Sequence, residues 1–285
     1  MFGFLSALFE YPFLQLSLGV ALAASLSGAL VGSYVVVKRI TFLAGAISHA
    51  VLSGLGGCLY VQRVWGWSWA DPFLGAILSA VCAASLLGWV HVHRQQREDA
   101  VIAILWAVGM AVGVIAISAT PGSGNDVMAF LFGNILWVSP SDLWLLLALD
   151  AFILLIFWWK NAALTAICFD EDQSTLQGLS VGRLYQLLLI LVAITVVLLT
   201  AVVGSVLVMA LLTIPSTIAA LHARSLPLLM GGAIVLGCLF CVLGIGISYP
   251  LDWPPGATIA LVSGIGYTLA LVAPNVTRLL QKRGS

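Results

Sequence analysis

The sequence contains few charged residues, because only 8% of its 285 residues are Asp, Glu, Lys or Arg. A soluble globular domain usually carries about 25% charged residues, so this composition excludes an ordinary water-soluble chain. The charge is also balanced, with 11 Lys and Arg against 11 Asp and Glu, which excludes the basic surface of a nucleic-acid-binding protein. Hydrophobic residues make up 62% of the sequence, and this fraction is typical of a chain that lies in a lipid bilayer.

Several motifs are also missing from the sequence. No Gly-Lys pair occurs, so the chain contains no P-loop and we do not expect it to be an enzyme that hydrolyses ATP. The 5 cysteines are odd in number and lie mostly within apolar segments, which fits core residues better than a disulfide framework. No Lys or Arg precedes Lys38, so the first apolar run lacks the charged start of a signal peptide and is expected to remain as a span.

Long apolar runs predict an all-α, polytopic membrane protein with a single domain over residues 1–285. Each span needs about 20 residues, so about nine spans use most of the chain and leave short connections. Pro72 and Pro140 mark helix starts. Proline has no backbone N–H, and the N–H groups of the first helical turn have no partner within the helix, so a proline there costs no hydrogen bond. The predicted spans are Phe13–Val37, Leu43–Val61, Asp71–Val90, Ala100–Ala119, Ser141–Trp159, Leu184–Val202, Ser205–Leu221, Leu226–Ser248 and Pro255–Ala273.

The distribution of basic residues predicts the orientation of these spans. Nine spans place the two termini on opposite sides of the membrane, and basic residues gather on the cytoplasmic side. A cytoplasmic C-terminus and an external N-terminus leave Arg63 as the only basic residue outside. Tryptophans near the ends of the spans, such as Trp65 and Trp159, fit the aromatic belts of a membrane protein.

One apolar segment, Met128–Val138, is too short to cross the bilayer. At about 1.5 Å per residue it reaches about half of a hydrocarbon core that is about 30 Å thick. It is either a re-entrant segment or a helix that lies in the membrane interface. Non-helical backbone at membrane depth occurs only where it is buried in protein or lines a wet cavity, so a re-entrant segment would indicate a permeation structure.

Polar side chains inside the spans are candidates for a transport pathway, because each is costly there unless it has a partner or a wet cavity. In the second span, His49 and Ser53 share a helix face with Gly45 and Gly56. His49 is either a hydrogen-bonded packing residue or a metal ligand. Asp150, in the fifth span, is either a carboxylate of the pathway or a partner in a helix-to-helix hydrogen bond.

A second polar stripe, formed by Ser205, Met209 and Thr213, runs along the seventh span. Gly204 precedes this stripe and Pro215 interrupts its far end. The span is therefore expected to be discontinuous, as substrate-site helices of transporters often are. Met209 is either a soft ligand for a transition metal or an ordinary core residue.

The connection over residues 160–182 has the pattern of a short helix. The residues that form this pattern are Phe169, Asp170, Glu171, Gly178 and Leu179. Asp170 suits an N-cap, acidic residues suit the first turn, and Gly178 suits the C-terminus. A helix that exposes apolar residues on the cytoplasmic side is typical of a docking site for another protein. A solvated loop is the alternative.

Short motifs are spread along nearly the whole chain. They are Gly32–Arg39, Ser48–Leu52, Arg97–Ala100, Leu131–Leu136, Phe169–Glu171, Val203–Leu212, Ile214–Pro215, Ser248–Tyr249 and Pro255–Ala257. In their order and spacing they resemble the membrane-spanning subunit of the metal-ion ABC importers, the permease family that carries zinc, manganese or iron.

This resemblance implies a permease of the ABC importer type in the bacterial inner membrane. It implies a dimer of permeases, formed with itself or with a paralogue, together with two cytoplasmic ABC ATPase subunits that use ATP and an external metal-binding protein. By the same similarity, the segment from Phe169 to Leu179 is the coupling helix that seats in the ATPase. The cargo is a divalent metal ion, and the resemblance implies no permanently bound cofactor and no catalytic residue.

The sequence departs from the family pattern at Gly45, where the family usually carries an Asp four residues before the histidine. A carboxylate and an imidazole at this spacing would face one cavity, so the glycine removes a charge and one hard ligand. His49 carries over as a candidate ligand, but its usual partner does not. The metal is either coordinated by His49 with other residues, such as Asp150 or Met209, or passes without tight coordination.

The function expected from the sequence is the import of a divalent transition-metal ion from an external binding protein into the cytoplasm. Two alternatives remain open. One is an ABC permease for a larger metal chelate such as a siderophore, and the other is an ion-coupled secondary carrier that works without an ATPase. The sequence does not select among zinc, manganese and iron.

Overall fold

The structure, a computed structural model, describes residues 7–94, 98–122, 133, 135 and 138–283, with only the backbone of Arg94, Glu98 and residues 273–283. Its helices are α2 (Pro12–Val37), α3 (Leu43–Val64), α4 (Pro72–Arg94), α5 (Glu98–Ser118), α7 (Pro140–Phe169), α8 (Glu171–Leu176), α9 (Val181–Val203), α10 (Ser205–Ala220), α11 (Leu226–Leu251) and α12 (Pro255–Arg283). Within the described residues, 8 helices are long and apolar enough to cross a membrane, and α10 is a shorter apolar helix. The predicted all-α, polytopic architecture is confirmed.

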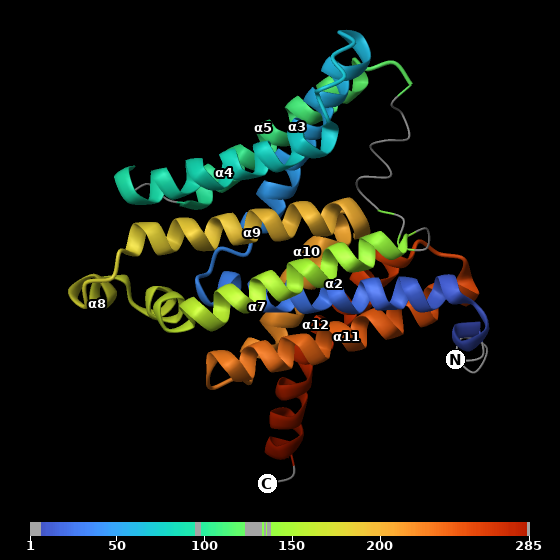
Figure 1. The fold of residues 1–285 in the computed structure, drawn as a ribbon. Helices are drawn as coiled ribbons and strands as arrows, with labels where there is room; N and C mark the ends of the chain where they lie inside the picture. Colours follow the sequence, from blue (N-terminus) through green and yellow to red (C-terminus); the bar gives the residue numbers. More distant parts are fainter. Residues whose placement is uncertain (1–6, 95–97, 123–132, 134, 136–137, 284–285) are drawn as a thin grey trace.

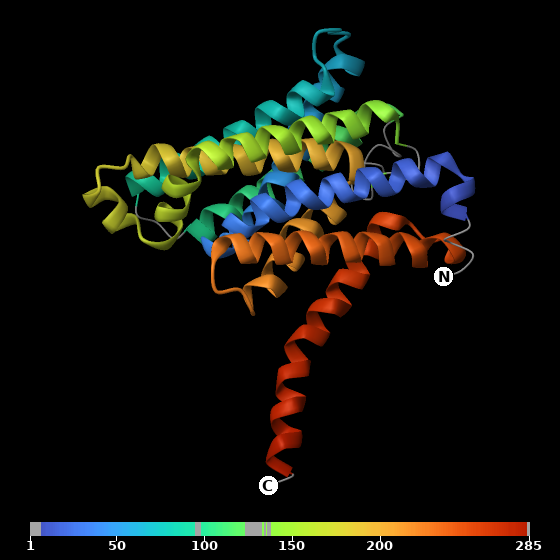
Figure 2. The same ribbon diagram turned by 60° about the horizontal axis from the view of Figure 1, so that its bottom comes forward.

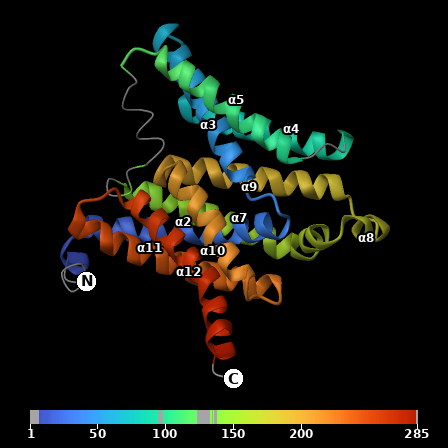
Figure 3. The same cartoon turned by 180° about the vertical axis from the view of Figure 1, so that it is seen from behind.

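The helices form two groups. One contains α3, α4 and α5, which pack against one another and lie to one side of the other helices (Figure 1, Figure 3). In the larger group, α2 packs against α7, α10 and α11 and is buried over most of its length. The two groups meet where α4 packs along α9. Figure 2 shows that the C-terminal half of α12 projects away from the other helices.

Two glycines of α2 allow it to approach α10 closely. Gly28 and Gly32 lie one turn apart on the face of α2 that meets α10. A Cβ atom at Gly32 would overlap the carbonyl oxygen of Leu212 and would lie 2.9 Å from Ser216 Oγ. Lipid tails are as apolar as leucine, so helices in a membrane associate through this kind of close packing rather than through the hydrophobic effect.

Glycines of α5 set the crossing of α3 and α5 in the same way. A Cβ atom at Gly109 would lie 2.9 Å from the backbone nitrogen of Ala50, and one at Gly113 would lie 2.7 Å from Leu52 Cγ. Gly56 of α3 in turn faces the carbonyl oxygen of Gly113. The small and polar stripe predicted along this span therefore faces α5 over much of its length.

The break in the seventh predicted span lies before the helix rather than at its proline. α9 ends at Val203 and α10 begins at Ser205, and Gly204 between them has φ 86° and ψ 154°, a conformation that glycine adopts readily. The expected interruption at Pro215 is wrong, because α10 continues through Pro215 to Ala220. The turn before Pro215 is packed tightly against α2, which keeps the helix together although the proline donates no hydrogen bond.

α7 begins at Pro140 as predicted but is longer than predicted. The apolar run ends near Trp159, yet the helix continues to Phe169. Lys160 Nζ lies 4.3 Å from the centroid of the Trp159 ring, which is a typical arrangement for a basic residue near the membrane interface. The helix extends past the end of its apolar run because no helix-breaking residue stops it there. The connection predicted over residues 160–182 is therefore reduced to residues 170–180.

The predicted re-entrant or interfacial segment, Met128–Val138, lies outside the described residues apart from three positions. Of these, Ile135 is buried and Gly133 has a positive φ of 62°. A Cβ atom at Gly133 would lie 2.6 Å from the backbone nitrogen of Gly204. This point of the chain therefore packs against the junction between α9 and α10.

The α2–α10 crossing gives a first testable prediction. Gly32→Ala should lower the free energy of unfolding by about 1–3 kcal/mol, because the new methyl group overpacks the crossing. Gly28→Ala is the matched control, since its Cβ would meet Leu211 at an ordinary distance of 3.5 Å and alanine favours a helix over glycine by up to about 1 kcal/mol. Thermal unfolding of the purified variants measures the difference. Equal stability of the two variants would contradict the close crossing.

Candidate functional site

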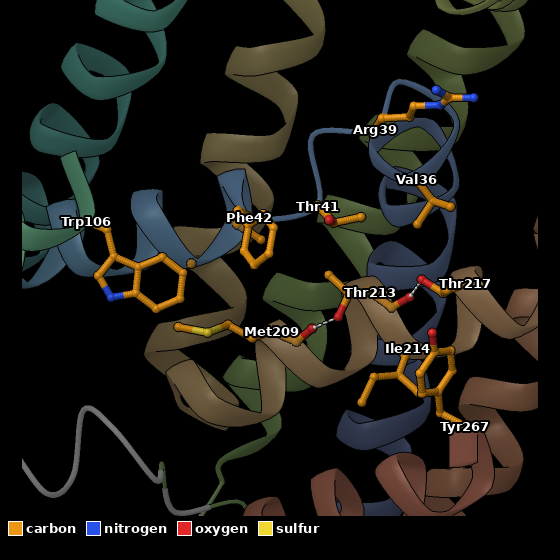
Figure 4. A pocket seen from close by; sticks show the side chains of 12 residues that line it. Val36, Arg39, Thr41, Phe42, Trp106, Met209, Thr213, Ile214, Thr217 and Tyr267 are labelled. Atoms are coloured by element: carbon orange, nitrogen blue, oxygen red, sulfur yellow. Dashed lines mark hydrogen bonds between the residues drawn. The ribbon is translucent and has the colours of Figure 1, made fainter. Parts of the chain in front are cut away.

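A cavity of about 540 Å³ lies between the two groups of helices. Its walls come from five parts of the chain: the end of α2 and the α2–α3 connection, the start of α3, α5, α10 and α12 (Figure 4). The side chains that line the cavity include those of Phe42, Trp106, Met209, Thr213, Tyr267 and Arg39. The cavity is thus built from segments that are far apart in the sequence and belong to both groups.

One face of α10 lines the cavity with part of the predicted polar stripe. Met209, Thr213 and Thr217 follow one another at intervals of four residues and so share this face. Thr213 Oγ1 donates to the carbonyl oxygen of Met209 at 2.6 Å, and Thr217 Oγ1 donates to that of Thr213 at 2.7 Å. The hydroxyl protons are therefore used within the helix, and each hydroxyl oxygen keeps its lone pairs as an acceptor. In Figure 4 the Met209 side chain points toward the Trp106 ring.

Trp106 of α5 occupies the space that a side chain at position 45 would need. A Cβ atom at Gly45 would overlap the Trp106 ring, lying 2.6 Å from Cη2. The absence of a side chain at Gly45 and the presence of the large ring of Trp106 are therefore two parts of one packing solution. This pair accounts for the lack of a side chain at position 45.

His49 lies one turn beyond Gly45 and is covered by the same tryptophan. The centroids of the His49 and Trp106 rings are 4.8 Å apart, and His49 is only 6% exposed. Its Nδ1 atom has no hydrogen-bond partner among the described residues. Trp106 also lines the cavity and His49 does not, so the indole lies beside the imidazole at the cavity wall.

The cavity holds few groups that bind a metal strongly. In the described ranges, no three side chains of His, Cys, Asp or Glu come together as a metal site, and the lining residues include no carboxylate. The thioether of Met209 is a soft ligand, and the imidazole of His49 lies beside Trp106 rather than in the lining.

The remaining candidates lie away from this cavity. Asp150 of α7 is 3% exposed and faces Ser27 of α2, and neither carboxylate oxygen has a hydrogen-bond partner in the part of the chain described. Ser53 Oγ donates to the carbonyl oxygen of Ala50 at 2.6 Å. Ser205 is buried at the first residue of α10.

The helix predicted within residues 160–182 is confirmed as α8. Asp170 is its N-cap, and its Oδ1 accepts the N–H of Gln173 at 2.9 Å. Gly178 has a positive φ of 79° just beyond the C-terminus, as the sequence indicated. Phe169 and Leu176 are 68% and 88% exposed, whereas Leu179 is half-buried. Phe169 at the end of α7 and Leu176 at the end of α8 are therefore apolar side chains that the described residues leave uncovered.

Sequence reasoning missed the aromatic side of the cavity. No role was predicted for Phe42, Trp106 or Tyr267 from the sequence. Gly45, four residues before His49, was the one feature of the sequence that could have indicated a large side chain nearby, because a glycine leaves room for such a neighbour. It does not reveal that the neighbour is Trp106 on another helix.

Residues 10–273 match the family described as the ABC 3 transport family. The chain belongs to the ABC 3 transport family. The resemblance noted in the sequence is thus confirmed at the level of the family. Because the match covers all the spans, the cavity and α8 both lie within the ABC 3 part of the chain.

Relatives of this ABC 3 chain match it over nearly their whole length. A probable metal transport system membrane protein of Chlamydia pneumoniae is 43% identical over 251 residues, which cover 88% of this chain and 85% of the relative. A manganese transport system membrane protein of Halalkalibacterium halodurans is 32% identical, over 94% of this chain and 89% of the relative. The solved structure of PsaBC from Streptococcus pneumoniae in complex with a Fab is similar with a TM-score of 0.80 and 29% identity, over 94% of each chain.

The packing of Gly45 against Trp106 gives a second prediction. Gly45→Ala should destabilise the protein by about 1–3 kcal/mol, because its methyl group must displace the indole ring. Gly57→Ala is the control on the same helix, since a Cβ atom there meets nothing within 4 Å. The double variant Gly45→Ala/Trp106→Leu should recover part of the loss. A Gly45→Ala protein that unfolds at the same temperature as Gly57→Ala would contradict the packing.

Proposed function

We propose that this chain is the membrane-spanning subunit of an ATP-driven importer for a divalent transition-metal ion. Its family and its similarity to membrane proteins named for metal and manganese transport support this function. The observation that carries the proposal is the combination, in one chain, of a cavity between spans and an exposed helix, α8, on a connection between two spans. Zinc, manganese and iron are the ions proposed from the resemblance.

The metal passes through the cavity between the two helix groups. Met209 and the hydroxyl oxygen of Thr213 offer weak donors along its wall, and weak donors let an ion leave as well as enter. His49 joins the pathway when Trp106 moves aside, because its Nδ1 is already free of hydrogen bonds to the described residues. Ser53 of α3 and Ser205 of α10 lie outside the cavity lining, on the same helix faces as His49 and Met209.

The transport energy comes from a separate ATPase, since the sequence contains no P-loop. The exposed Phe169 and Leu176 provide the apolar surface on which such an ATPase would dock. The complete importer then contains two permease chains, two ATPase subunits and an external metal-binding protein. With α8 in the cytoplasm, the positive-inside rule places the N-terminus outside and the C-terminus inside.

The lining of the cavity favours a second candidate, an ABC permease for a metal chelate. Three aromatic rings and Arg39 face a volume of about 540 Å³, and the described residues of the wall include no Asp or Glu. Aromatic side chains and an arginine are better suited to binding an anionic organic metal complex than a bare divalent cation. A bare divalent cation prefers carboxylate, imidazole or thiolate ligands. An ion-coupled secondary carrier has no comparable support. Such a carrier works without an ATPase, so the exposed apolar side chain of α8 would have no protein to dock on.

Uptake assays test the pathway and give a third prediction. His49→Ala should reduce uptake of the transported metal by about tenfold or more, because disturbing the surroundings of a metal site typically changes affinity or activity about 10–100-fold. Met209→Leu keeps the side-chain volume and removes the sulfur, so it should weaken uptake of a soft metal more than uptake of manganese. The importer is reconstituted in proteoliposomes with its ATPase and binding protein, and uptake of labelled ions is measured.

The control for His49→Ala is His222→Ala, which changes an exposed histidine between α10 and α11. This variant should transport like the wild type. Full activity of His49→Ala would remove His49 from the pathway. Uptake of metal only as a preformed organic complex would establish the chelate candidate, and uptake without the ATPase would establish a secondary carrier.

A further inference from the structure

Two basic side chains from two different spans hold the carboxylate of Glu171. Lys38, which follows the last residue of α2, forms an ion pair with Oε1 of Glu171. His91, near the end of α4, has its Nε2 3.3 Å from Oε2 of the same residue. Each carboxylate oxygen therefore has its own partner. Glu171 is the first residue of α8, so the pairs connect this short helix to two spans.

The cluster also contacts the two helices that flank α8 in the sequence. Lys38 Nζ donates to the carbonyl oxygen of Ile167 at 3.0 Å, in the last turn of α7, where helix carbonyls lack a partner within the helix. The Tyr185 ring of α9 lies 4.0 Å from the His91 ring and 5.6 Å from Lys38 Nζ, measured to ring centroids. Tyr185 is buried. Ends of α2, α4, α7 and α9 thus converge on the N-terminus of α8.

The partly buried position of the cluster makes these contacts stronger than surface ion pairs. The exposed side-chain fractions are 13% for Lys38, 17% for His91 and 33% for Glu171. Exposed ion pairs contribute little to stability, whereas pairs shielded from water are weakened less by solvent and salt. Asp172, one residue beyond Glu171, is exposed. The acidic start of α8 therefore contains one anchored carboxylate and one solvated carboxylate.

The two anchors of Glu171 belong to the two separate groups of helices. α2 is the central helix of the larger group, and α4 belongs to the group with α3 and α5 (Figure 1). The cavity described above lies between these groups. A displacement of α8 that acted on α7 and α9 alone would reach the smaller group only indirectly, through the packing of α9 against α4. Through Glu171 the same displacement acts on α2 and α4 together.

We propose that Glu171 is a positioning residue that fixes α8 to both helix groups and passes its movement into them. Lys38 holds it to the larger group and His91 to the smaller one, and Tyr185 packs beneath both. The inference rests on the proposed function, in which α8 docks on an ATPase. In this proposal, the ion-pair cluster couples ATP hydrolysis to the opening and closing of the cavity.

The test uses the reconstituted importer with three variants. Glu171→Gln keeps the side-chain shape and removes the charge, the swap Lys38→Glu/Glu171→Lys restores an ion pair in reverse, and Asp172→Asn is the matched control on the exposed neighbour. The three readouts are co-purification of the ATPase, the rate of ATP hydrolysis, and the amount of metal transported per ATP. The last ratio separates a positioning role from a merely structural one.

Glu171→Gln should bind the ATPase and hydrolyse ATP, but the metal transported per ATP should fall about fivefold or more, which is the lower end of typical coupling between sites. Asp172→Asn should match the wild type, and the charge swap should recover part of the ratio. An unchanged ratio in Glu171→Gln would overturn the proposal. Failure of the swap to recover any of the loss would also count against the ion pair.

A second measurement does not depend on the variants folding well. Spin labels at Val92 of α4 and Gln177 beyond α8, both exposed, report the distance between the two helices in the wild-type background. This distance should stay the same with and without ATP while the cavity changes. A distance that changes with nucleotide would overturn the proposal. Failure of the proposed function would give a different result: Leu176→Ser, which changes an apolar side chain of α8 that is 88% exposed, would then leave ATPase binding unaffected.

Discussion

The close approach of helices at glycine residues is the constraint on which this structure depends. In a membrane, apolar side chains gain no hydrophobic free energy by moving from lipid into protein. Helices are therefore held together by close packing and by hydrogen bonds. Gly32 brings α2 against α10, and Gly109 brings α5 against α3. These crossings define the two groups of helices. The cavity lies between the two groups, and its walls are fixed by how closely the helices within each group can approach one another.

The same constraint shapes the candidate pathway. Gly45 leaves space that the Trp106 ring fills, and the ring in turn covers His49. A residue larger than glycine would push the indole away, so the size of one side chain decides how the only histidine of α3 is shielded. Weak donors on α10, with Met209 among them, complete the wall. In the proposed importer, weak donors of this kind would let the ion leave the cavity as well as enter it.

Much of the fold could be predicted from the sequence because its causes are local. Apolar runs mark the spans, and Asp170 and Gly178 mark the ends of α8 within a few residues of the helix itself. The misjudged features depend on partners distant in the sequence. Pro215 does not end α10 because α2 packs against the preceding turn, and Trp106 could not be assigned to Gly45 without the α3–α5 crossing. Lys38 and Glu171 were both visible as parts of motifs, but only the fold brings them together.

The most direct test of the central claim is the metal content of cells that lack this gene, compared with the same cells carrying the wild-type gene. Manganese, iron and zinc are measured by mass spectrometry while each metal in turn is made scarce. An importer of one of these ions predicts that the content of that metal falls in the deletion strain and returns with the wild-type gene. If no metal content changes under any of the three limitations, the import of a divalent transition metal by this chain is contradicted.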